Sequence, residues 1–325
     1  MEFEDLTPYV VIDMVEEALG CQLTGYAAPL PSYINRVYEL ETADKQRIVA
    51  KFYRPARWDK ETLLDEHKFT IECAEAEVPV VAPMTLENGQ TLGCIEGIFF
   101  VVFPKRAGRR FEITDDEGWA RIGGLIGRMH MVGSSGVAEN RVTLHPDSLT
   151  RSEVDYLVDG QFITASYESE FRKLMDDVFS VVSDRFNDVE PIRIHADCHY
   201  GNILDRMDEG LLLIDFDDMM MGPAIQDLWL VLPDHIHNCR PEFDAMIDGY
   251  EQFAEFDYFS LKLLEPLRIL RIIYFLSWCA RQSADFKFQH NFPDWGKDAF
   301  WRTEIADIRH QLNIIREDDK RRSGF

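Results

Sequence analysis

The sequence predicts an α+β protein of two lobes, a small sheet lobe over residues 1–104 and a larger, mainly helical lobe over residues 105–325. Alternating and β-branched apolar runs concentrate in the first region, and helical apolar patterns dominate the second. A polar, glycine-containing stretch, PKRAGRR at 104–110, separates them and is the candidate hinge. A chain of 325 residues is long enough for each lobe to bury its own core. The order of elements therefore favours a sheet lobe with one main helix, joined to a helical lobe.

The first lobe is expected to open with a helix. Thr7 precedes Pro8, which matches an N-cap followed by proline at the first helical position, and Gly20 would end that helix. The further elements expected here are a loop leading into a strand, a second strand stopped by Pro55, a helix and two more strands, over residues 29–40, 48–55, 59–76 and 91–104.

The second lobe is expected to begin with a helix after a capping box, because Thr114 and Glu117 have the required spacing. Gly124 and Gly127 fall inside this helix and indicate close packing on another element. Further helices are expected over residues 166–187 and 261–282, and a loose polar tail over residues 316–325.

Composition narrows the class of partner. The chain has 34 Lys and Arg against 58 Asp and Glu, a net charge of −24. We expect no nucleic-acid binding, because that requires basic stripes. The charge permits a cationic small molecule or a basic peptide as substrate, and it permits equally a generally acidic surface that favours solubility.

The same reading predicts a cytoplasmic protein without a membrane partner. No apolar run approaches the roughly 20 residues that a membrane-spanning helix needs. The N-terminal segment MEFEDLTPYVV is acidic and lacks the basic region of a signal peptide. The six cysteines are scattered without a CxxC pair, which is typical of reduced thiols.

The most informative segment is IRIHADCHYGNILDRMDEGLLLIDFDD, residues 192–218. Its pattern predicts an apolar strand, a polar loop, a second apolar strand and then a carboxylate pair. Asn202 lies five residues after Asp197, and Asp215 lies 13 residues after Asn202. This spacing is typical of a catalytic loop followed by a metal-binding aspartate in phosphoryl-transfer enzymes.

Four residues of this segment have a predicted role. Asp197 is the candidate base that accepts or orients the proton of an attacking hydroxyl. Asn202 and Asp215 are candidate ligands of Mg²⁺ on nucleotide phosphates, which also places Asp215 in the catalytic set. In an extended chain Asp217 points the same way as Asp215, so we expect Asp217 rather than Asp218 as a further ligand. The alternative for this last pair is a solvated turn.

Three other polar residues lie near this segment. His195 is expected to be structural, packing beneath the metal-binding residues and bonding to backbone. His199 could contact the transferred phosphate or only shape the loop. The cluster HADCH is too cramped for a standard zinc site. Asp227, in IQDLW, is expected to be buried and to brace the catalytic loop.

A lysine inside an apolar strand is costly unless it has a role. Lys51, in IVAKFY, matches the strand lysine that binds nucleotide phosphates in kinases. Its expected partner is Glu66 on the next helix, with Glu61 and Glu72 as alternatives.

No G-x-G-x-x-G string precedes the lysine strand, so the loop PSYINR is expected to cover the phosphates. Ser32 offers a hydroxyl and backbone N–H groups as nucleotide contacts. Asn35 and Arg36 could support the turn.

These strings together resemble a known family. H-x-D-x-H-x-x-N followed by I-D-x-D-D resembles the aminoglycoside phosphotransferase and choline kinase group, which has the bilobal protein-kinase-like fold. SYINRVY, VAKFYRPARW, LLDEHKF, HADCHYGNIL and GPAIQDLW are similar to the stress response kinase A family, bacterial Ser/Thr protein kinases within that group. The similar pieces run from about residue 30 to about residue 295 in the expected order. Ala196 departs from the superfamily, where glycine is common.

The resemblance implies ATP and Mg²⁺ as cofactors, transfer to Ser or Thr of protein substrates, autophosphorylation and a role in stress survival. It implies that Asp197 is the active-site aspartate, that Asn202 and Asp215 hold Mg²⁺, and that Ser32 contacts ATP.

Two other functions stay open at this point. A small-molecule hydroxyl kinase, acting on an aminoglycoside, choline or homoserine-like acceptor, is favoured by the short segment between Asp215 and Asp227, which contains no Ser, Thr or Tyr and cannot form an activation segment. Seven acids between residues 241 and 270 could serve an amine or a basic peptide. A nucleotide-binding pseudokinase would have lost catalytic residues, whereas Lys51, Asp197 and Asn202 are all present, as is Asp215.

Overall fold

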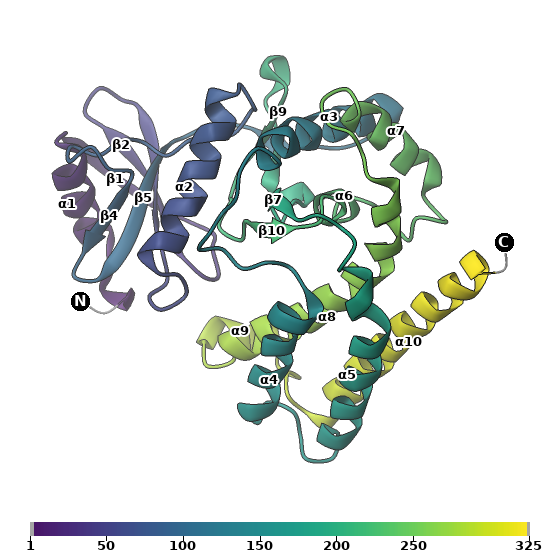
Figure 1. Ribbon diagram of the computed structural model, residues 1–325. Helices are drawn as coiled ribbons and strands as arrows, with labels where there is room; N and C mark the ends of the chain where they lie inside the picture. The colour runs from purple at the N-terminus through teal and green to yellow at the C-terminus, as the bar shows by residue number, and fades with distance from the viewer. Residues whose placement is uncertain (1–2, 324–325) are drawn as a thin grey trace. The chain divides into compact units, whose positions relative to one another are not determined.

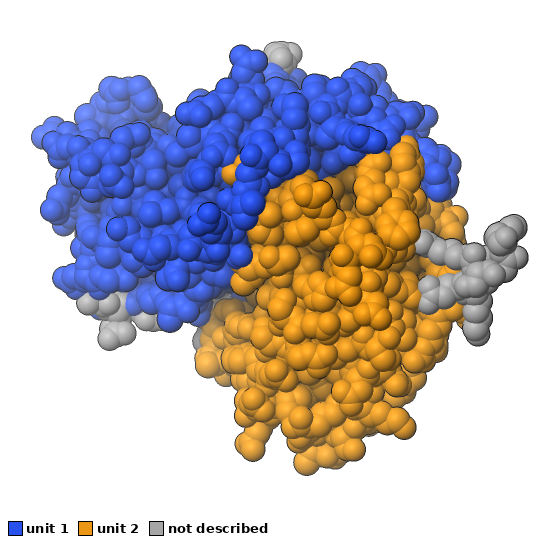
Figure 2. All heavy atoms as spheres, in the orientation of Figure 1, with its two compact units in different colours: residues 1–141, 195–219, 240–255 blue, residues 142–194, 220–239, 256–325 orange. Residues whose placement is uncertain are grey.

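The computed structural model of the chain describes residues 3–323 (Figure 1). Its contacts divide the chain into two compact units, which Figure 2 colours separately. The first takes residues 1–141, 195–219 and 240–255, and the second takes residues 142–194, 220–239 and 256–325. The lobe boundary predicted after residue 104 falls inside the first unit and stays a prediction. Both units mix helices and strands, in agreement with the predicted α+β class.

A five-stranded antiparallel sheet organises the N-terminal part of the first unit, in the order β1-β2-β3-β5-β4. The strands are β1 (Leu23–Leu30), β2 (Arg36–Thr42), β3 (Arg47–Phe52), β4 (Leu92–Ile95) and β5 (Ile98–Pro104). Strands β2 to β5 lie where strands were predicted. The sequence did not predict β1, because Gly25 and Pro29 interrupt its apolar pattern.

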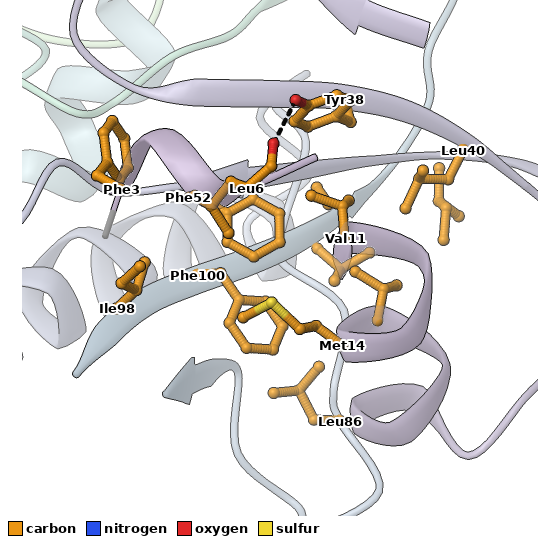
Figure 3. Packing of buried hydrophobic residues seen from close by; sticks show 14 residues of the cluster. Phe3, Leu6, Val11, Met14, Tyr38, Leu40, Phe52, Leu86, Ile98 and Phe100 are labelled. Atoms are coloured by element: carbon orange, nitrogen blue, oxygen red, sulfur yellow. Dashed lines mark hydrogen bonds between the residues drawn. The ribbon is translucent and has the colours of Figure 1, made fainter. Parts of the chain in front are cut away.

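Helix α1 (Pro8–Leu19) covers one face of this sheet. Figure 3 shows Val11 and Met14 of the helix packed among Phe52, Phe100 and other buried side chains of the sheet. The Tyr38 hydroxyl donates to the Leu6 carbonyl at 2.7 Å, so this buried hydroxyl is paired. Gly20 ends the helix with φ +61°, as the sequence predicts.

Helix α2 (Lys60–Glu75) covers the opposite face, where Leu63 packs with Tyr53, Leu92 and Val101. Asp59 caps this helix by accepting from Thr62 N at 2.9 Å. Successive strand residues face opposite sides, so the side chains of β3 on either side of Lys51 enter the α1 core while Lys51 faces α2.

The rest of the first unit holds a second sheet and two helices. The sheet has the order β6-β8-β9. These elements are β6 (Arg109–Arg110), β8 (Ile203–Asp205), β9 (Leu211–Leu213), α3 (Asp116–Gly133) and α7 (Arg240–Tyr250). Helices α3 and α7 pack on one another through glycines. Strands β8 and β9 pair with one another between Asn202 and Asp215, so this hairpin brings the end of the predicted catalytic loop near the start of the predicted metal-binding segment.

The second unit is mainly helical and carries one small sheet. Its elements are α4 (Arg151–Asp159), α5 (Glu168–Val182), β7 (Ile192–Ile194), β10 (Met220–Gly222), α6 (Ile225–Trp229), α8 (Leu264–Gln282), α9 (Phe286–Asn291) and α10 (Asp298–Ser323). Helix α8 packs against α4, α6 and α10, and most of its residues are buried, as its apolar pattern predicts. Trp301 of α10 is fully buried and donates from Nε1 to the Phe162 carbonyl at 3.0 Å.

Two local predictions were wrong. Helix α3 is capped by Asp115, whose carboxylate accepts from Gly118 N at 2.9 Å, and not by the Thr114–Glu117 capping box. A carboxylate is the stronger acceptor at the positive end of a helix, so Asp115 takes the cap position. The tail after residue 316 is not loose as far as Ser323, because α10 continues to that residue; residues 324–325 lie outside the described part.

Two further findings bear on the expected environment. In the part of the chain that the structure describes, every helix is too short or too polar to cross a bilayer. All six cysteines are free, and Cys73, Cys198, Cys239 and Cys279 are buried.

The contact between α3 and α7 gives a test of the fold. A methyl group on Gly123 would lie 1.8 Å from the Met246 carbonyl oxygen, whereas on Gly124 it would meet the Phe253 ring at 3.3 Å. We expect Gly123→Ala to lower the free energy of unfolding by about 1–3 kcal/mol, because two backbones must separate. Gly124→Ala is the control and should stay within about 1 kcal/mol of wild type, since helix propensity offsets the closer contact. Urea unfolding of both variants measures this, and equal effects would contradict the packing.

A buried histidine gives a pH-dependent test. Burial lowers the pKa of His67 to about 3, with Lys51 and Arg141 adding to the effect. Between pH 6.5 and 3 the unfolded chain therefore binds a proton that the folded chain refuses, so stability falls as pH falls through this window. We expect His67→Gln, which keeps hydrogen-bonding capacity toward Tyr53 and Thr91, to remove part of this loss.

The measurement is the free energy of unfolding of both proteins from pH 7.5 to pH 4. Wild type should lose up to about 1 kcal/mol per pH unit more than the variant below pH 6. Parallel curves would show that His67 does not contribute to acid sensitivity.

Candidate active site

The catalytic loop is tied to the metal-binding segment through His195. Its ring is fully buried and lies 4.7 Å from the ring of Phe216. Nε2 donates to the Ile214 carbonyl at 2.9 Å, and Nδ1 accepts from Asp197 N at 3.3 Å. These partners assign the neutral Nε2–H tautomer. His195 therefore has the structural surroundings that the sequence predicts for it.

Asp197 and Asn202 lie together after this histidine. Asn202 Nδ2 donates to the Asp197 carbonyl at 3.0 Å and lies 3.4 Å from the carboxylate oxygen Oδ2. This orientation turns the Asn202 Oδ1 atom away from Asp197 and leaves it as a possible cation ligand. His199 Nδ1 accepts from Gly201 N at 2.9 Å, and its Nε2 lies 3.3 Å from Asp197 Oδ2. His199 thus shapes the loop and also contacts the candidate base.

The metal-binding segment places its aspartates in different surroundings. Asp215 has φ +66° and a side chain that is 53% exposed. Asp217 is buried, with Lys51 Nζ 3.5 Å from its Oδ1. Both aspartates face Lys51, since Asp215 Oδ1 also lies 3.5 Å from Nζ. Their common direction comes from a left-handed residue and a turn, and not from the extended chain that the sequence suggested.

Lys51 and Glu66 are brought together at 3.0 Å, and Glu66 is the one of the three candidate glutamates whose contact with Lys51 the structure records. Arg141, with no exposed side-chain surface, pairs with the other Glu66 oxygen at 3.3 Å. Burial lowers the pKa of the Lys51 ammonium, but the carboxylates of Glu66, Asp217 and Asp215 raise it more, so the net pKa is well above its usual range. Burial raises the pKa of Glu66, although the charges of Lys51 and Arg141 act to lower it.

The loop between β1 and β2, which contains Ser32, is held by side chains in place of glycines. The Ser32 hydroxyl accepts from Asn35 N at 3.2 Å. Arg54 donates to the Ile34 carbonyl at 3.0 Å and to the Tyr33 carbonyl at 3.2 Å. Asn35 Oδ1 accepts from Arg54 N, and its Nδ2 donates to Asp217 at 3.3 Å. Asn35 therefore joins the Ser32 loop to the metal-binding segment.

Sequence reasoning missed three arginines of this site. Arg54 supports the Ser32 loop, Arg57 pairs with Asp217 and Asp218, and Arg141 binds Glu66. Arg141 also donates to the Asp217 carbonyl at 2.7 Å. The string RPAR is the sequence signal for basic residues in this region. The carboxylate partners of Arg57 and Arg141 lie far away in sequence, so no local pattern indicates these pairs.

Other predicted positions have different outcomes. Asp227 is fully buried in α6 of the second unit, and its bracing role stays a prediction. Arg36 lies over the Phe3 ring, at 5.6 Å from its centre, and no contact with the Ser32 turn is recorded for it. Among residues 3–323, no group of three or more His, Cys, Asp or Glu side chains could hold a metal ion without other ligands. The predicted set of Asn202 with Asp215 is of another kind, since one ligand is an amide.

The backbone of the catalytic loop gives a further test. Ala196 has φ +66°, a conformation that costs L-residues roughly 1–2 kcal/mol. We expect Ala196→Gly to raise the free energy of unfolding by about 0.5–1 kcal/mol, after the loss of a buried methyl group is allowed for. Ala224→Gly, at φ −52°, is the control and should lower it by about as much. Urea unfolding checks both, and a loss in Ala196→Gly would exclude strain at this position.

Comparison with known proteins places this geometry in a family. A model of the phosphotransferase enzyme family (APH) matches residues 27–264. Stress response kinase A of Escherichia coli strain K12 is 36% identical over 316 residues, which cover 97% of this chain and 95% of that protein. Serine/threonine protein kinase RdoA of Salmonella typhimurium strain LT2 is 35% identical over 323 residues, with the same shares.

Solved structures agree at the level of the fold. Amicoumacin kinase hAmiN superposes with a TM-score of 0.74 at 16% identity, covering 94% of this chain and 92% of that one. This likeness confirms the predicted kinase-like fold, with a sheet-rich N-terminal region and a helical C-terminal region. The chain is therefore a phosphotransferase that belongs to the APH family and, within it, to the stress response kinase A family.

Proposed function

We propose that this protein transfers the γ-phosphoryl group of ATP to serine or threonine of a protein substrate, with Mg²⁺ as cofactor. The observation that carries the proposal is the gathering of Lys51–Glu66, Asp197–Asn202 and Asp215 in one compact unit. The name of its Salmonella relative, a serine/threonine protein kinase, supports protein as the acceptor. The amicoumacin kinase structure contains AMP-PNP and Ca²⁺, which supports a nucleotide with a divalent cation.

The residues at the site fit Mg²⁺. Asn202 Oδ1 and the exposed Asp215 carboxylate are hard oxygen donors, and Mg²⁺ is commonly held by one or two protein ligands together with phosphate and water oxygens. When bound, the ion neutralises charge on the phosphates of the nucleotide.

The chain's own groups have separate tasks in the proposed reaction. The Asp197 carboxylate accepts the proton of the attacking hydroxyl, while Asn202 and His199 hold its orientation. The Lys51 ammonium, kept charged by its carboxylate neighbours, attracts the phosphates. The Ser32 loop, held by Asn35 and Arg54, offers backbone N–H groups to the same phosphates.

A small-molecule hydroxyl kinase is the second candidate. Among the structurally similar proteins are amicoumacin kinase and an aminopropanol kinase, with TM-scores of 0.74 and 0.68, and both names give small acceptors. A pseudokinase is disfavoured because every predicted catalytic residue is present with its partners.

The deciding experiment measures label transfer from γ-labelled ATP with Mg²⁺, to the protein itself, to a generic basic protein and to a panel of amines and aminoglycosides. Asp197→Asn should lower transfer by about 10²–10⁴-fold, the usual contribution of a general base, while ATP binding changes little. Asp205→Asn, in β8 and outside the site, is the matched control. Label on serine or threonine supports the proposal. Label confined to a small molecule would replace it with the second candidate.

A further inference from the structure

Asp217 differs from Asp215 in its contacts. Its side chain is 8% exposed, against 53% for Asp215. Asn35 Nδ2 donates to Oδ2 at 3.3 Å, and Lys51 Nζ lies 3.5 Å from Oδ1. The guanidinium of Arg57 also donates to Oδ2. Both carboxylate oxygens of Asp217 are therefore engaged with donors of the chain, whereas Asp215 contacts Lys51 through Oδ1 and is otherwise largely exposed.

Arg57 links the two carboxylates that follow the predicted metal ligand. One guanidinium nitrogen, Nη1, donates to Asp217, and the other, Nη2, donates to Asp218. The side chain is only 17% exposed, and its guanidinium lies 5.3 Å from the centre of the Trp58 ring. A planar guanidinium held at both ends in this way is a fixed positive charge that stays protonated at every working pH.

The charges of this network balance. Three cations, Lys51, Arg57 and Arg141, stand against three carboxylates, Glu66, Asp217 and Asp218. Buried charges are tolerated when each has an opposite partner, and this set meets that condition without an added ion. Asp215 also contacts Lys51, at 3.5 Å, and is counted apart from this set because 53% of its side chain is exposed. Asp197 contacts Asn202 and His199.

We propose that Arg57 is a built-in cation at this site, and that it removes Asp217 and Asp218 from metal binding. This deepens the proposed function, on which it rests. The divalent cation is then held by Asn202 and Asp215, and Asp217 is a positioning residue that draws the Ser32 loop, Lys51 and the metal-binding segment together. The sequence-based expectation had Asp217 as a ligand, since an extended chain would present it beside Asp215.

The test uses the full-length chain and Mn²⁺ as the probe, with free Mn²⁺ measured by electron paramagnetic resonance in the presence of a non-hydrolysable ATP analogue. Asp215→Asn should weaken Mn²⁺ binding by at least about tenfold, as expected on loss of a ligand. Asp217→Asn should leave the Mn²⁺ affinity within about threefold while its phosphate transfer falls, because positioning and not ligation is lost. A loss of Mn²⁺ binding in Asp217→Asn as large as in Asp215→Asn would overturn the proposal.

Arg57→Met tests the built-in cation directly. It frees two neighbouring carboxylates, so we expect one more bound Mn²⁺ per chain than in wild type. An unchanged number would overturn the role of Arg57.

The double variant Arg57→Met with Asp217→Asn guards against misfolding, since Asp217→Asn alone leaves Lys51 and Arg57 with one carboxylate partner fewer. It should melt closer to wild type than either single variant and bind Mn²⁺ with wild-type affinity. A double variant that has lost Mn²⁺ binding while keeping wild-type stability would also overturn the proposal. Absence of Mn²⁺ binding in wild type itself would reject the proposed function together with this inference, so the two failures are distinguishable.

Discussion

The buried ion pair of Lys51 and Glu66 is the interaction on which the rest of the site depends. It joins a strand and a helix on one face of the sheet, and both side chains are almost fully buried. Removing one partner of such a pair costs about 3–5 kcal/mol, because the other charge is left buried alone. The pair persists because Arg141 and Asp217 supply further opposite charges, and Arg141 also holds the backbone of the metal-binding segment. The same contacts therefore set the position of the Lys51 and Glu66 side chains and balance their charges. Loss of one contact changes both.

Each of the two loops that these contacts hold contains a residue in the left-handed region, which is unfavourable for L-residues. Ala196 and Asp215 both have φ +66°, and each is the residue next to a predicted functional group or that group itself. His195 lies between the loops and bonds to both, which lets the fold maintain two unfavourable conformations at once. Such strain persists only where the surroundings over-determine the geometry. The turn at Asp215 exposes its carboxylate, whereas the turn that follows buries the carboxylate of Asp217.

The sequence predicted what local pattern can specify. Four of the five strands of the first sheet, the helices α1, α2, α3, α5 and α8, and the spacing of Asp197, Asn202 and Asp215 all follow from periodicity and motif. Arg57 and Arg141 could not be predicted in the same way, because each pairs with a carboxylate at least 75 residues away. A periodic pattern of apolar residues does not indicate which arginine pairs with which carboxylate across such a separation.

The fold specifies the proposed phosphate-binding part of this protein more closely than its acceptor part. Every contact of the site that the structure resolves, from the Ser32 loop to Lys51 and Asp215, concerns groups suited to a charged phosphate chain. The segment between Asp215 and Asp227 is too short to form a platform for a peptide, and much of it is buried. An acceptor must then be recognised by other surfaces, and a family with one phosphate site can serve antibiotics, amines and proteins by changing those surfaces alone. Acceptor class in this chain is therefore a question for label transfer, whereas the proposed metal ligands, Asn202 and Asp215, are a question for Mn²⁺ binding.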